Sequence, residues 1–381
     1  MSSEGGAPVI AGDAIAVIAL PCMSETKSGI LITGVPGFIG GRLAERLLPS
    51  GRPLFLLCER RFLADANRFA KTLDPTGEQV SVVGGDITEH DLGLSSEDVA
   101  RLRAEVSDVY HLAAIYELGV GEALARRVNV LGTAKVVAFL RGFAAGSVRH
   151  HYISTCYVAG DREGMIFEDE LDRGQGFKNH YEATKYEAEV TVERSKRDIE
   201  TRIFRPGIVI GDSRTGETAK FDGPYPVFGA VMMGLMVALP GPGRATINLV
   251  PVDFVIECLV RIPEQPGTAS KTFQLADPAP LASRAVVELV AARTGSPRPR
   301  LVLPPGLVRR ALKLPRVAEL AGIGVESLAY FNHPQTYDTT NTRAALAGTG
   351  CACPPLPTYI NQILRHYRQR AKLAWRFDDG G

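Results

Sequence analysis

A tyrosine and a lysine four residues apart could carry out proton-transfer chemistry in this chain. Tyr181-x-x-x-Lys185 opens a helical pattern that continues from Tyr186 to Lys196. On a helix, residues four apart share one face. A lysine ammonium beside a phenol lowers the phenol's pKa from ~10, which makes Tyr181 a candidate general acid or base. The alternative is an incidental pair on a surface helix.

Two hydroxyl residues precede this pair and favour the catalytic interpretation. Ser154 and Thr155 end the stretch His151-Tyr-Ile-Ser-Thr155, which is expected to form a strand. At the carboxyl edge of a sheet, a hydroxyl can bind a substrate carbonyl oxygen. Beside a nicotinamide, Thr155, Tyr181 and Lys185 would form a proton-donating carbonyl site, with Ser154 in support.

A glycine-rich turn near the start of the chain predicts a phosphate-binding site. An apolar strand around Ile30–Ile32 leads into the turn, and a helical pattern follows it. Gly34 would permit the tight turn, Gly37 the close approach of a pyrophosphate, and Gly40 the packing of helix on strand. The helix N-terminus would present free N–H groups to the anion. Three glycines can also be only a turn, but the flanking strand and helix favour a dinucleotide site.

The positions of these residues require a particular sheet. Apolar strands alternate with helical patterns such as Ala123–Phe143, which predicts an α/β fold with a doubly wound parallel Rossmann sheet. The special residues then lie at the carboxyl ends of strands, where such sheets bind ligands. The further expected strands are Leu54–Leu57, Val80–Val83, Val109–Ala114 and Thr201–Phe204.

The composition changes along the chain and suggests a division into domains. Residues 1–27 are expected to form a flexible leader, and residues 28–211 the dinucleotide-binding domain, with a strand and helix returning near 246–262. Residues 212–381, rich in Gly and Pro at their start, are expected to form mainly a smaller substrate lobe.

Charge and cysteine usage exclude several classes of function. The 43 Lys and Arg residues nearly balance 42 Asp and Glu residues, so no basic field favours nucleic acid. The six cysteines lack zinc-ligand spacing, so we expect no metal and reduced thiols in a cytoplasmic protein. No stretch reaches the ~18 apolar residues of a membrane span.

Taken together, the motifs resemble those of the extended short-chain dehydrogenase/reductase superfamily. The resemblance runs in order from about Gly29 to Asp253. It is carried by Thr33-Gly-x-x-Gly37-Phe-Ile-Gly40, Gly85-Asp86-Ile87, His111-Leu-Ala-Ala114, Asn129-Val-x-Gly-Thr133, Ser154-Thr155, Tyr181-x-x-x-Lys185 and Arg205-Pro-Gly207.

The resemblance implies a role for each matching residue. Tyr181 would be the acid/base, Lys185 would bind the nicotinamide ribose and lower the Tyr181 pKa, and Thr155 would orient the reacting carbonyl or alcohol. Asn129 would support the site through backbone or water hydrogen bonds. The implied cofactor contacts are Phe38 and Ile39 in the glycine turn, Asp86 and Ile87 at the adenine, Ala113 and Ala114 along the pyrophosphate and ribose, and Pro206, Gly207, Ile208 and Val209 beside the nicotinamide.

Three details favour the thioester-reductase and fatty-acyl-reductase-like branch: Ser-Thr-x-Tyr-Val at 154–158, Tyr-Glu-x-Thr-Lys-x-x-Ala-Glu at 181–189 and Arg-Pro-Gly-Ile-Val-x-Gly at 205–211. The expected activity is NAD(P)H-dependent reduction of a carbonyl or activated acyl group on an apolar substrate. The same site run backwards would oxidise an alcohol. Alternatives are a nucleotide-sugar epimerase or dehydratase with bound NAD, and a dinucleotide-binding scaffold without turnover.

The end of the second strand bears on the choice of cofactor. An Asp there would bind the ribose hydroxyls of NAD, whereas an Arg suits the 2′-phosphate of NADP. Cys58 occupies the Asp position and Glu59 follows, but Arg60 and Arg61 come next and could bind phosphate bidentately. NADP(H) is therefore favoured, with Arg60 as the expected contact, and NAD(H) remains an alternative.

The substrate half offers weaker signals. Met232, Met233 and Met236 could line an acyl channel or fill the core, and Tyr116 could contact substrate. The basic, partly apolar segment Tyr359–Phe377 could lie on a membrane surface or pack on the substrate lobe, which is favoured; Leu307–Val317 is a similar mixture. A homodimer through the Tyr181–Lys196 helix is an expectation from the resemblance.

Overall fold

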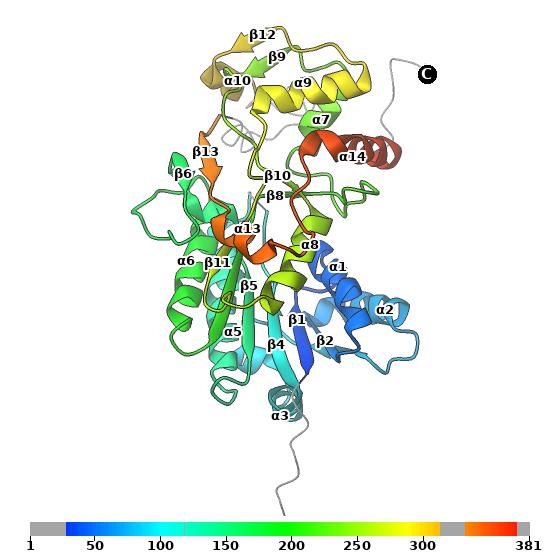
Figure 1. The fold of residues 1–381 in the computed structure, drawn as a ribbon, viewed down its shortest axis with the longest axis vertical. Coiled ribbons are helices and arrows are strands. Elements are labelled where there is room, and N and C mark those ends of the chain that lie inside the picture. Colours follow the sequence, from blue (N-terminus) through cyan, green and yellow to red (C-terminus); the bar gives the residue numbers. More distant parts are fainter. Residues whose placement is uncertain (1–27, 118, 313–331, 372–381) are drawn as a thin grey trace, which may run out of the picture.

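The centre of the molecule is a seven-stranded parallel sheet with helices on both faces (Figure 1). The computed structural model describes residues 28–117, 119–312 and 332–371. The strand order is β11-β7-β5-β4-β1-β2-β3, which confirms the predicted doubly wound fold. The strands are β1 (Gly29–Thr33), β2 (Leu54–Cys58), β3 (Val80–Gly84), β4 (Val106–His111), β5 (Arg149–Ile153), β7 (Glu200–Pro206) and β11 (Thr272–Leu275).

Both faces of the sheet are buried, which explains why the neighbouring strands β1 and β2 are almost continuously apolar. Ile30 and Ile32 of β1 belong to one core cluster and Leu31 to the cluster on the opposite face. Helices α1 (Phe38–Leu47) and α8 (Val252–Arg261) pack in the first cluster. The second contains residues of α3 (Ser96–Glu105), α5 (Thr133–Leu140) and α6 (His180–Ser195).

The chain reverses its direction of progress through the sheet between β1 and β4. β1 pairs with β2 on one side and with β4 on the other, so the crossovers diverge beyond the carboxyl ends of β1 and β4. This is the position at which doubly wound sheets leave a crevice for a ligand. The glycine turn leads from β1 into this crevice.

Two strands end earlier than the sequence indicated. The predicted strand 109–114 is β4, Val106–His111, and the predicted strand 151–155 is β5, Arg149–Ile153. Apolar residues continue past the end of β4, and Ser154 and Thr155 follow β5 directly, so the sequence alone does not show where pairing stops. As a result Ala113, Ala114 and Thr155 lie on loops beyond the sheet rather than on strands.

A separate hydrophobic core, the upper core, lies above the carboxyl edge of the sheet. It joins residues of α7 (Tyr225–Met232), α9 (Ser283–Thr294) and α14 (Leu356–Ala371) with Ile210 and Leu249. The smaller elements of this half are β8 (Ile208–Ile210), β9 (Ala238–Pro240), β10 (Leu249–Pro251), β12 (Leu301–Leu303) and α10 (Pro305–Leu312), with β8 pairing β10 and β9 pairing β12.

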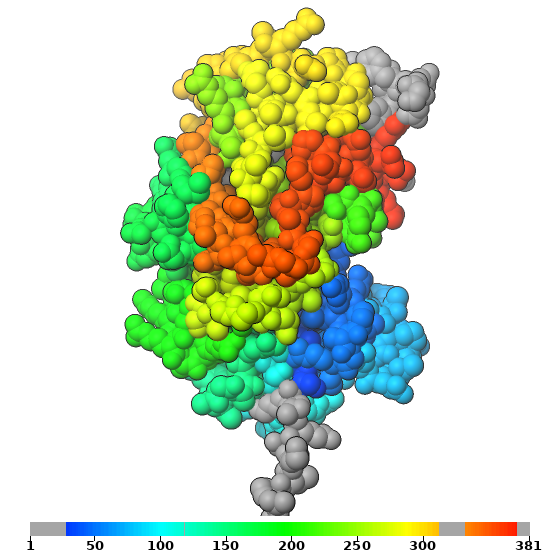
Figure 2. All heavy atoms as spheres, in the orientation of Figure 1, coloured from blue at the N-terminus to red at the C-terminus, as the bar shows by residue number. Residues whose placement is uncertain are grey.

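The chain crosses between the two halves repeatedly. After the upper elements, β11 returns to form the outer strand of the sheet, although the sequence placed residues 212–381 mainly in the substrate lobe. Later, β13 (Gln335–Tyr337) pairs with β6 (Gly164–Ile166), and α13 (Thr340–Leu346) packs beside β11. Figure 2 shows β13 and α13 covering the junction of the two halves on this face.

The remaining helical segments are short or irregular. The predicted helix 123–143 is built from α4 (Glu122–Ala125), a π-helical stretch, Arg126–Gly132, and α5. Helix α2 (Leu63–Leu73) lies between β2 and β3. Single 3₁₀ turns are Leu48–Ser50, Arg60–Phe62, His90–Gly93, Cys156–Ala159 and Ile262–Glu264.

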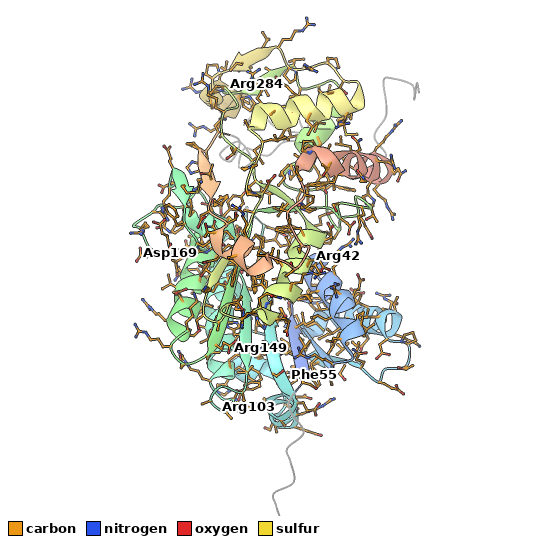
Figure 3. The ribbon with its side chains drawn as sticks, viewed as in Figure 1. Arg42, Phe55, Arg103, Arg149, Asp169 and Arg284 are labelled. Atoms are coloured by element: carbon orange, nitrogen blue, oxygen red, sulfur yellow. The ribbon has the colours of Figure 1, made fainter. Side chains whose placement is uncertain are left out.

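A buried ionic cluster holds the amino end of the sheet. Asp108 is 1% exposed and accepts from His151 Nε2 at 2.9 Å and from Arg149 Nε at 2.7 Å; Arg52 also pairs with it. Arg149 lies near the lower end of the sheet in Figure 3. The carboxyl end, with the ligand crevice, is at the opposite edge, so this cluster serves the fold rather than the site.

Candidate active site

The turn between β1 and α1 forms a cradle that admits no side chain. Gly34 has φ of +84°, a conformation that L-residues rarely adopt, and the Gly37 N–H donates to the Gly34 carbonyl oxygen at 3.0 Å. A Cβ at Gly37 would lie 2.6 Å from that oxygen, and one at Gly40 would lie 2.8 Å from it. The backbone is therefore open to a close neighbour at the N-terminus of α1, as a pyrophosphate requires.

This cradle opens into a cavity of about 1290 Å³ between the sheet edge and the upper core. That volume is sufficient for a dinucleotide and a substrate together. Nearly all of the sequence-predicted site residues line it, namely Gly34, Gly37, Phe38, Ile39, Gly40, Asp86, Ile87, Ala113, Ala114, Ser154, Thr155, Tyr181, Lys185, Pro206, Gly207, Ile208 and Val209.

Tyr181 lies in the first turn of α6. The helix begins with a capping arrangement in which the Glu182 N–H donates to the Asn179 side chain at 3.0 Å, and the Lys178 N–H donates to the Glu182 carboxylate at 2.8 Å. The Tyr181 hydroxyl hydrogen-bonds to Thr155, whose oxygen also accepts from the Tyr157 N–H at 3.2 Å. The two hydroxyls predicted to hold a carbonyl oxygen are therefore brought together in the cavity wall.

The protonation of Tyr181 differs from the sequence expectation. Burial raises the pKa of Tyr181 to about 12, and the hydrogen bond from Thr155 only partly opposes this. Glu182 and Cys156 raise the pKa of Tyr181 further. The free energy needed to remove a phenolate from water exceeds the stabilisation that the hydrogen bond from Thr155 gives it. Tyr181 is consequently held as a neutral phenol that can donate its proton at neutral pH.

Lys185 lies one turn further along α6 and its side chain turns toward β5. Its Nζ donates to the Ile153 carbonyl oxygen at 2.8 Å and to the Tyr152 hydroxyl at 3.0 Å. The side chain is 4% exposed, and burial lowers the pKa of Lys185 to about 8, opposed by the charge of Glu189. Tyr152 was not predicted as a site residue, although it lies on β5 only two residues before Ser154.

Asn129 does not line the cavity and supports it from behind. Its side-chain oxygen accepts from the Ile115 N–H at 2.9 Å, and its amide donates to the Ile115 carbonyl at 3.0 Å and to Thr184 Oγ1 at 3.1 Å. Asn129 belongs to the π-helical stretch, a rare geometry that occurs often at functional sites. It fastens the loop after β4 to α6, the helix that carries Tyr181 and Lys185.

Ser154 lines the cavity, but its hydroxyl is bonded within the protein rather than offered to a ligand. Its hydroxyl donates to the carboxylate of Glu189 on α6. The same carboxylate pairs with Arg205 of β7, with Nε 2.9 Å from Oε1. These contacts leave Thr155 as the hydroxyl that accompanies Tyr181.

The two arginines considered for the phosphate contact lie differently relative to the cavity. Arg60 lies outside the cavity wall and donates to the Gly93 carbonyl oxygen at 2.8 Å, whereas Arg61 lines the cavity together with Cys58 and Glu59. Both arginines lie in one 3₁₀ turn, Arg60–Phe62, where consecutive side chains point in different directions. The Arg61 guanidinium pairs with Glu59 at 2.8 Å.

The far end of the cavity is apolar. Val227 and Phe228 of α7, Ile247, Leu249, and Val286 and Val287 of α9 line it, and none of these was predicted. Of the three predicted methionines, Met232 and Met236 pack in the upper core, and none of the three lines the cavity.

Tyr116, which the sequence offered as a possible substrate contact, also lines the cavity. Lys220, from the loop before α7, lies 4.7 Å from the centroid of its ring.

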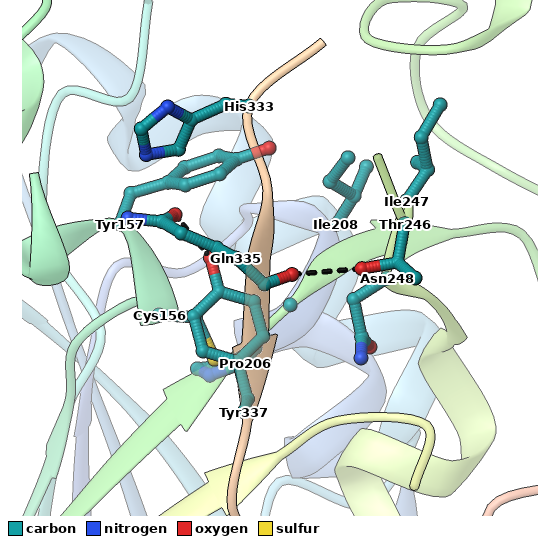
Figure 4. Close-up of a pocket in the computed structure, with 11 residues that line it drawn as sticks. Cys156, Tyr157, Pro206, Ile208, Thr246, Ile247, Asn248, His333, Gln335 and Tyr337 are labelled. Atoms are coloured by element: carbon teal, nitrogen blue, oxygen red, sulfur yellow. Dashed lines mark hydrogen bonds between the residues drawn. The ribbon is translucent and has the colours of Figure 1, made fainter. Parts of the chain in front are cut away.

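A small polar pocket adjoins the large cavity (Figure 4). Tyr157, Ile247 and residues 206–208 line both spaces. Its other wall comes from the β13 segment, where the Thr246 hydroxyl donates to the Gln335 carbonyl at 2.7 Å and the Tyr337 hydroxyl donates to the Gln335 side chain at 3.0 Å. Because these groups satisfy one another, the pocket wall is a structural junction between the halves.

Neither a metal cluster nor a membrane span occurs in the part of the chain that the structure describes. Within these ranges, no group of three or more His, Cys, Asp or Glu residues could hold a metal ion. None of the described helices has the length and apolar character to cross a membrane.

α14 packs Tyr359, Ile360 and Ile363 into the upper core, in agreement with the favoured prediction. Residues 1–27, 313–331 and 372–381 lie outside the described chain.

The fold and the site define a class. A parallel sheet with a glycine cradle at the switch point and a Thr/Tyr/Lys set beside it is the arrangement of an NAD(P)-binding short-chain dehydrogenase/reductase. Residues 32–259 match the model of the family described as "Male sterility protein". The chain belongs to this family, within the extended short-chain dehydrogenase/reductases.

Relatives of this chain include parts of longer proteins. It is 26% identical over 291 residues to glycine betaine reductase ATRR of Emericella nidulans, covering 70% of this chain and 22% of that protein. It is 25% identical over 282 residues to fatty acyl-CoA reductase wat of Drosophila melanogaster, covering 62% and 54%. The chain thus spans about half or less of the length of these relatives.

Among solved structures, the terminal R domain of the myxalamid PKS-NRPS biosynthetic pathway superposes with a TM-score of 0.80 at 26% identity, covering 94% of both chains. The UDP-glucuronic acid 4-epimerase of Bacillus cereus superposes with a TM-score of 0.64 at 18% identity over 90% of this chain and 99% of that chain. At that identity, the epimerase shows a shared fold alone.

Proposed function

We propose that this protein is an NADPH-dependent reductase of a carbonyl or thioester-activated acyl group carried on an apolar molecule. The observation that carries the proposal is the hydrogen-bonded pair of Thr155 and Tyr181, which faces a cavity that also contains the glycine cradle. The similarity to a fatty acyl-CoA reductase and to an R domain supports the acyl branch over the epimerase.

The residues of this chain would divide the work as follows. The glycine cradle and the N-terminus of α1 would hold the pyrophosphate, and Pro206 to Val209 would lie beside the nicotinamide, which supplies a hydride when bound. Thr155 and Tyr181 would bind the substrate oxygen. Tyr181 would donate its proton as negative charge develops on that oxygen.

The protonation state of Tyr181 supports the reductive direction. With a pKa of about 12, the phenol keeps its proton until a stronger base forms beside it. An alkoxide-like oxygen is such a base, whereas oxidation of an alcohol would need a phenolate at the outset. For a thioester, the hydride supplied by the nicotinamide would add to the carbonyl carbon and the proton of Tyr181 to the oxygen, which would give a hemithioacetal that collapses to an aldehyde and a free thiol.

The cavity walls support an apolar substrate. Val227, Phe228, Val286 and Val287 offer a long apolar surface at the end away from the glycine cradle. For the cofactor, Arg61 lines the wall at the predicted adenosine end and supports NADP(H) over NAD(H), although Glu59 competes for it.

The test is oxidation of NADPH or NADH, followed at 340 nm, against long-chain acyl-CoAs, aldehydes and ketones. Tyr181→Phe should lower kcat by ~10²–10⁴-fold while dinucleotide affinity stays the same. NADPH oxidation that depends on Tyr181 supports the proposal. Wild-type protein that binds dinucleotide yet oxidises none of it with any substrate would sink the proposal and favour the epimerase or scaffold.

A further inference from the structure

A chain of buried polar groups runs from the end of β1 to Lys185. It starts at Thr33, which is fully buried at the last position of β1. Thr33 Oγ1 accepts from the N–H groups of Leu112 and Ala113, both at 3.1 Å. With both lone pairs occupied, its own hydrogen goes to Nδ1 of His111, 2.9 Å away.

This donation fixes the tautomer of His111. Burial lowers the pKa of His111 well below its usual range, so the ring is neutral and carries its single hydrogen on Nε2. Nε2 lies 3.1 Å from Thr133 Oγ1 and donates to it. Thr133 in turn hydrogen-bonds to the Tyr152 hydroxyl.

Tyr152 brings the chain to the lysine. Its hydroxyl oxygen accepts from Lys185 Nζ at 3.0 Å, and Nζ lies 4.5 Å from the centroid of the same ring. The Tyr152 side chain is 1% exposed and packs in the core between β5 and the helices. An ammonium has three hydrogens; two are given to Tyr152 and to the Ile153 carbonyl, which leaves one for the cavity.

We propose that Tyr152 is a positioning residue for Lys185, and that Thr133, His111 and Thr33 hold the Tyr152 phenol in place. The inference rests on the proposed function only for its catalytic consequence. The same chain bonds the backbone of Leu112 and Ala113, which line the cavity. The wall of the dinucleotide site and the lysine are therefore fixed by one rigid network.

The charged and titratable surroundings of Lys185 set the expected pH effect. Glu189 and Tyr181 lie on its own helix, His111 on β4, Tyr152 on β5, and Arg205 of β7 lies beyond Glu189. Glu189 favours the ammonium and burial disfavours it. The Tyr152 oxygen accepts a hydrogen bond that is stronger from the ammonium than from the neutral amine, so its removal should favour the neutral amine and move the titration of Lys185 to lower pH.

The experiment compares Tyr152→Phe with Tyr110→Phe. Tyr110, on the neighbouring strand β4, is also buried, and its hydroxyl donates to the Leu259 carbonyl at 3.1 Å. The substitution therefore removes one buried hydrogen bond, as Tyr152→Phe does, but in the core cluster on the opposite face of the sheet. The first readout needs neither cofactor nor turnover: trace acetylation of Lys185 at a series of pH values, quantified by peptide mass spectrometry. We expect half-labelling to move about one pH unit lower in Tyr152→Phe and to stay in place in Tyr110→Phe.

The second readout is kinetic. Tyr152→Phe should lower kcat about tenfold, with the KM for dinucleotide little changed, and should shift the pH profile of kcat. Thr133→Val should lower kcat in the wild-type background and have no further effect in Tyr152→Phe, because it acts through that phenol. A Tyr152→Phe protein in which Lys185 labels at the same pH as in Tyr110→Phe would overturn the inference, whatever its kcat.

The two readouts separate this inference from the proposed function. If wild-type protein turns over no substrate, the proposed reductase fails, but the acetylation profile still tests whether Tyr152 controls Lys185. If wild-type protein is active and Lys185 labels identically in both variants, the reductase stands and Tyr152 has no positioning role.

Discussion

The guanidinium of Arg205 lies across the carboxylate of Glu189, with Nε 2.9 Å and Nη2 2.5 Å from the same oxygen. Both side chains are at most 2% exposed, and Ser154 donates to the other carboxylate oxygen. The pair ties α6, which carries Tyr181 and Lys185, to β7 and to the loop that carries Thr155. The relative positions of the three predicted catalytic residues depend on it.

Breaking this pair should destabilise the fold strongly. Glu189→Gln leaves the buried Arg205 without a counter-charge, and we expect a loss of about 3–5 kcal/mol in the free energy of unfolding. Urea denaturation measures it. Glu187→Gln, two residues earlier on α6, removes an exposed ion pair with Arg126 at 2.7 Å and should cost less than about 1 kcal/mol. Equal losses would contradict the role given to the buried pair.

The glycine cradle predicts a change in binding without a change in folding. In Gly37→Ala the new methyl group would be forced against the Gly34 carbonyl oxygen, so the turn must open and dinucleotide affinity should fall at least tenfold. The matched control is Gly41→Ala in the same helix, where the nearest atom would be Phe69 at an ordinary 3.5 Å. That variant should bind normally and unfold at higher urea, because Ala favours a helix over Gly. Titration with NADPH by fluorescence or calorimetry distinguishes the two.

Lys185 predicts a particular dependence of stability on pH. Its pKa is about 8 in the folded protein, against ~10.4 when unfolded. Between these values the unfolded chain binds a proton that the folded chain does not, so this group makes stability rise with pH. Below pH 8 the burial of the charged Lys185 lowers the free energy of unfolding by its full amount, about 3 kcal/mol. Lys185→Met should therefore gain stability relative to wild type at pH 7, and the gain should shrink toward pH 10. A difference that stays constant or grows would refute the lowered pKa.

The position of Arg61 predicts the basis of cofactor choice. Arg61→Ser should raise the KM for NADPH about tenfold and leave that for NADH nearly unchanged, because a charge-assisted hydrogen bond to the 2′-phosphate is lost. Arg60→Ser, one residue earlier, should have no such effect, since Arg60 bonds to the Gly93 carbonyl away from the cavity. Loss of NADPH preference in Arg60→Ser instead would reverse this assignment.

The sequence predicted the sheet and the ligand edge because both follow from local patterns. Apolar runs mark buried parallel strands, and glycine, hydroxyl and Tyr/Lys residues recur where those runs end. The partners of each side chain depend on distant segments and were not predictable. Lys185 binds Tyr152 rather than Tyr181, because burial and the reach of the side chain decide its rotamer.

Other misses have the same origin. β11 and the β6–β13 pair are three or four residues long, and only pairing with strands far away in the sequence defines them. Val227 and Val286 line the cavity because α7 and α9 pack over the sheet edge, which no local pattern reports. Arg60 and Arg61 could not be distinguished, because the direction of each side chain depends on a single 3₁₀ turn.

The repeated crossing of the chain between the two halves affects how this protein can acquire new specificity. The outer strand of the sheet, β11, is reached only after the chain has built α7 and β10 above it, and β13 and α13 descend again beside it. A single exchange of sequence at one junction would thus leave either half with foreign or missing strands. Recombination of whole lobes is a poor route to a new substrate in this architecture. Successive point substitutions in the apolar wall, on a scaffold that stays intact, are the accessible route.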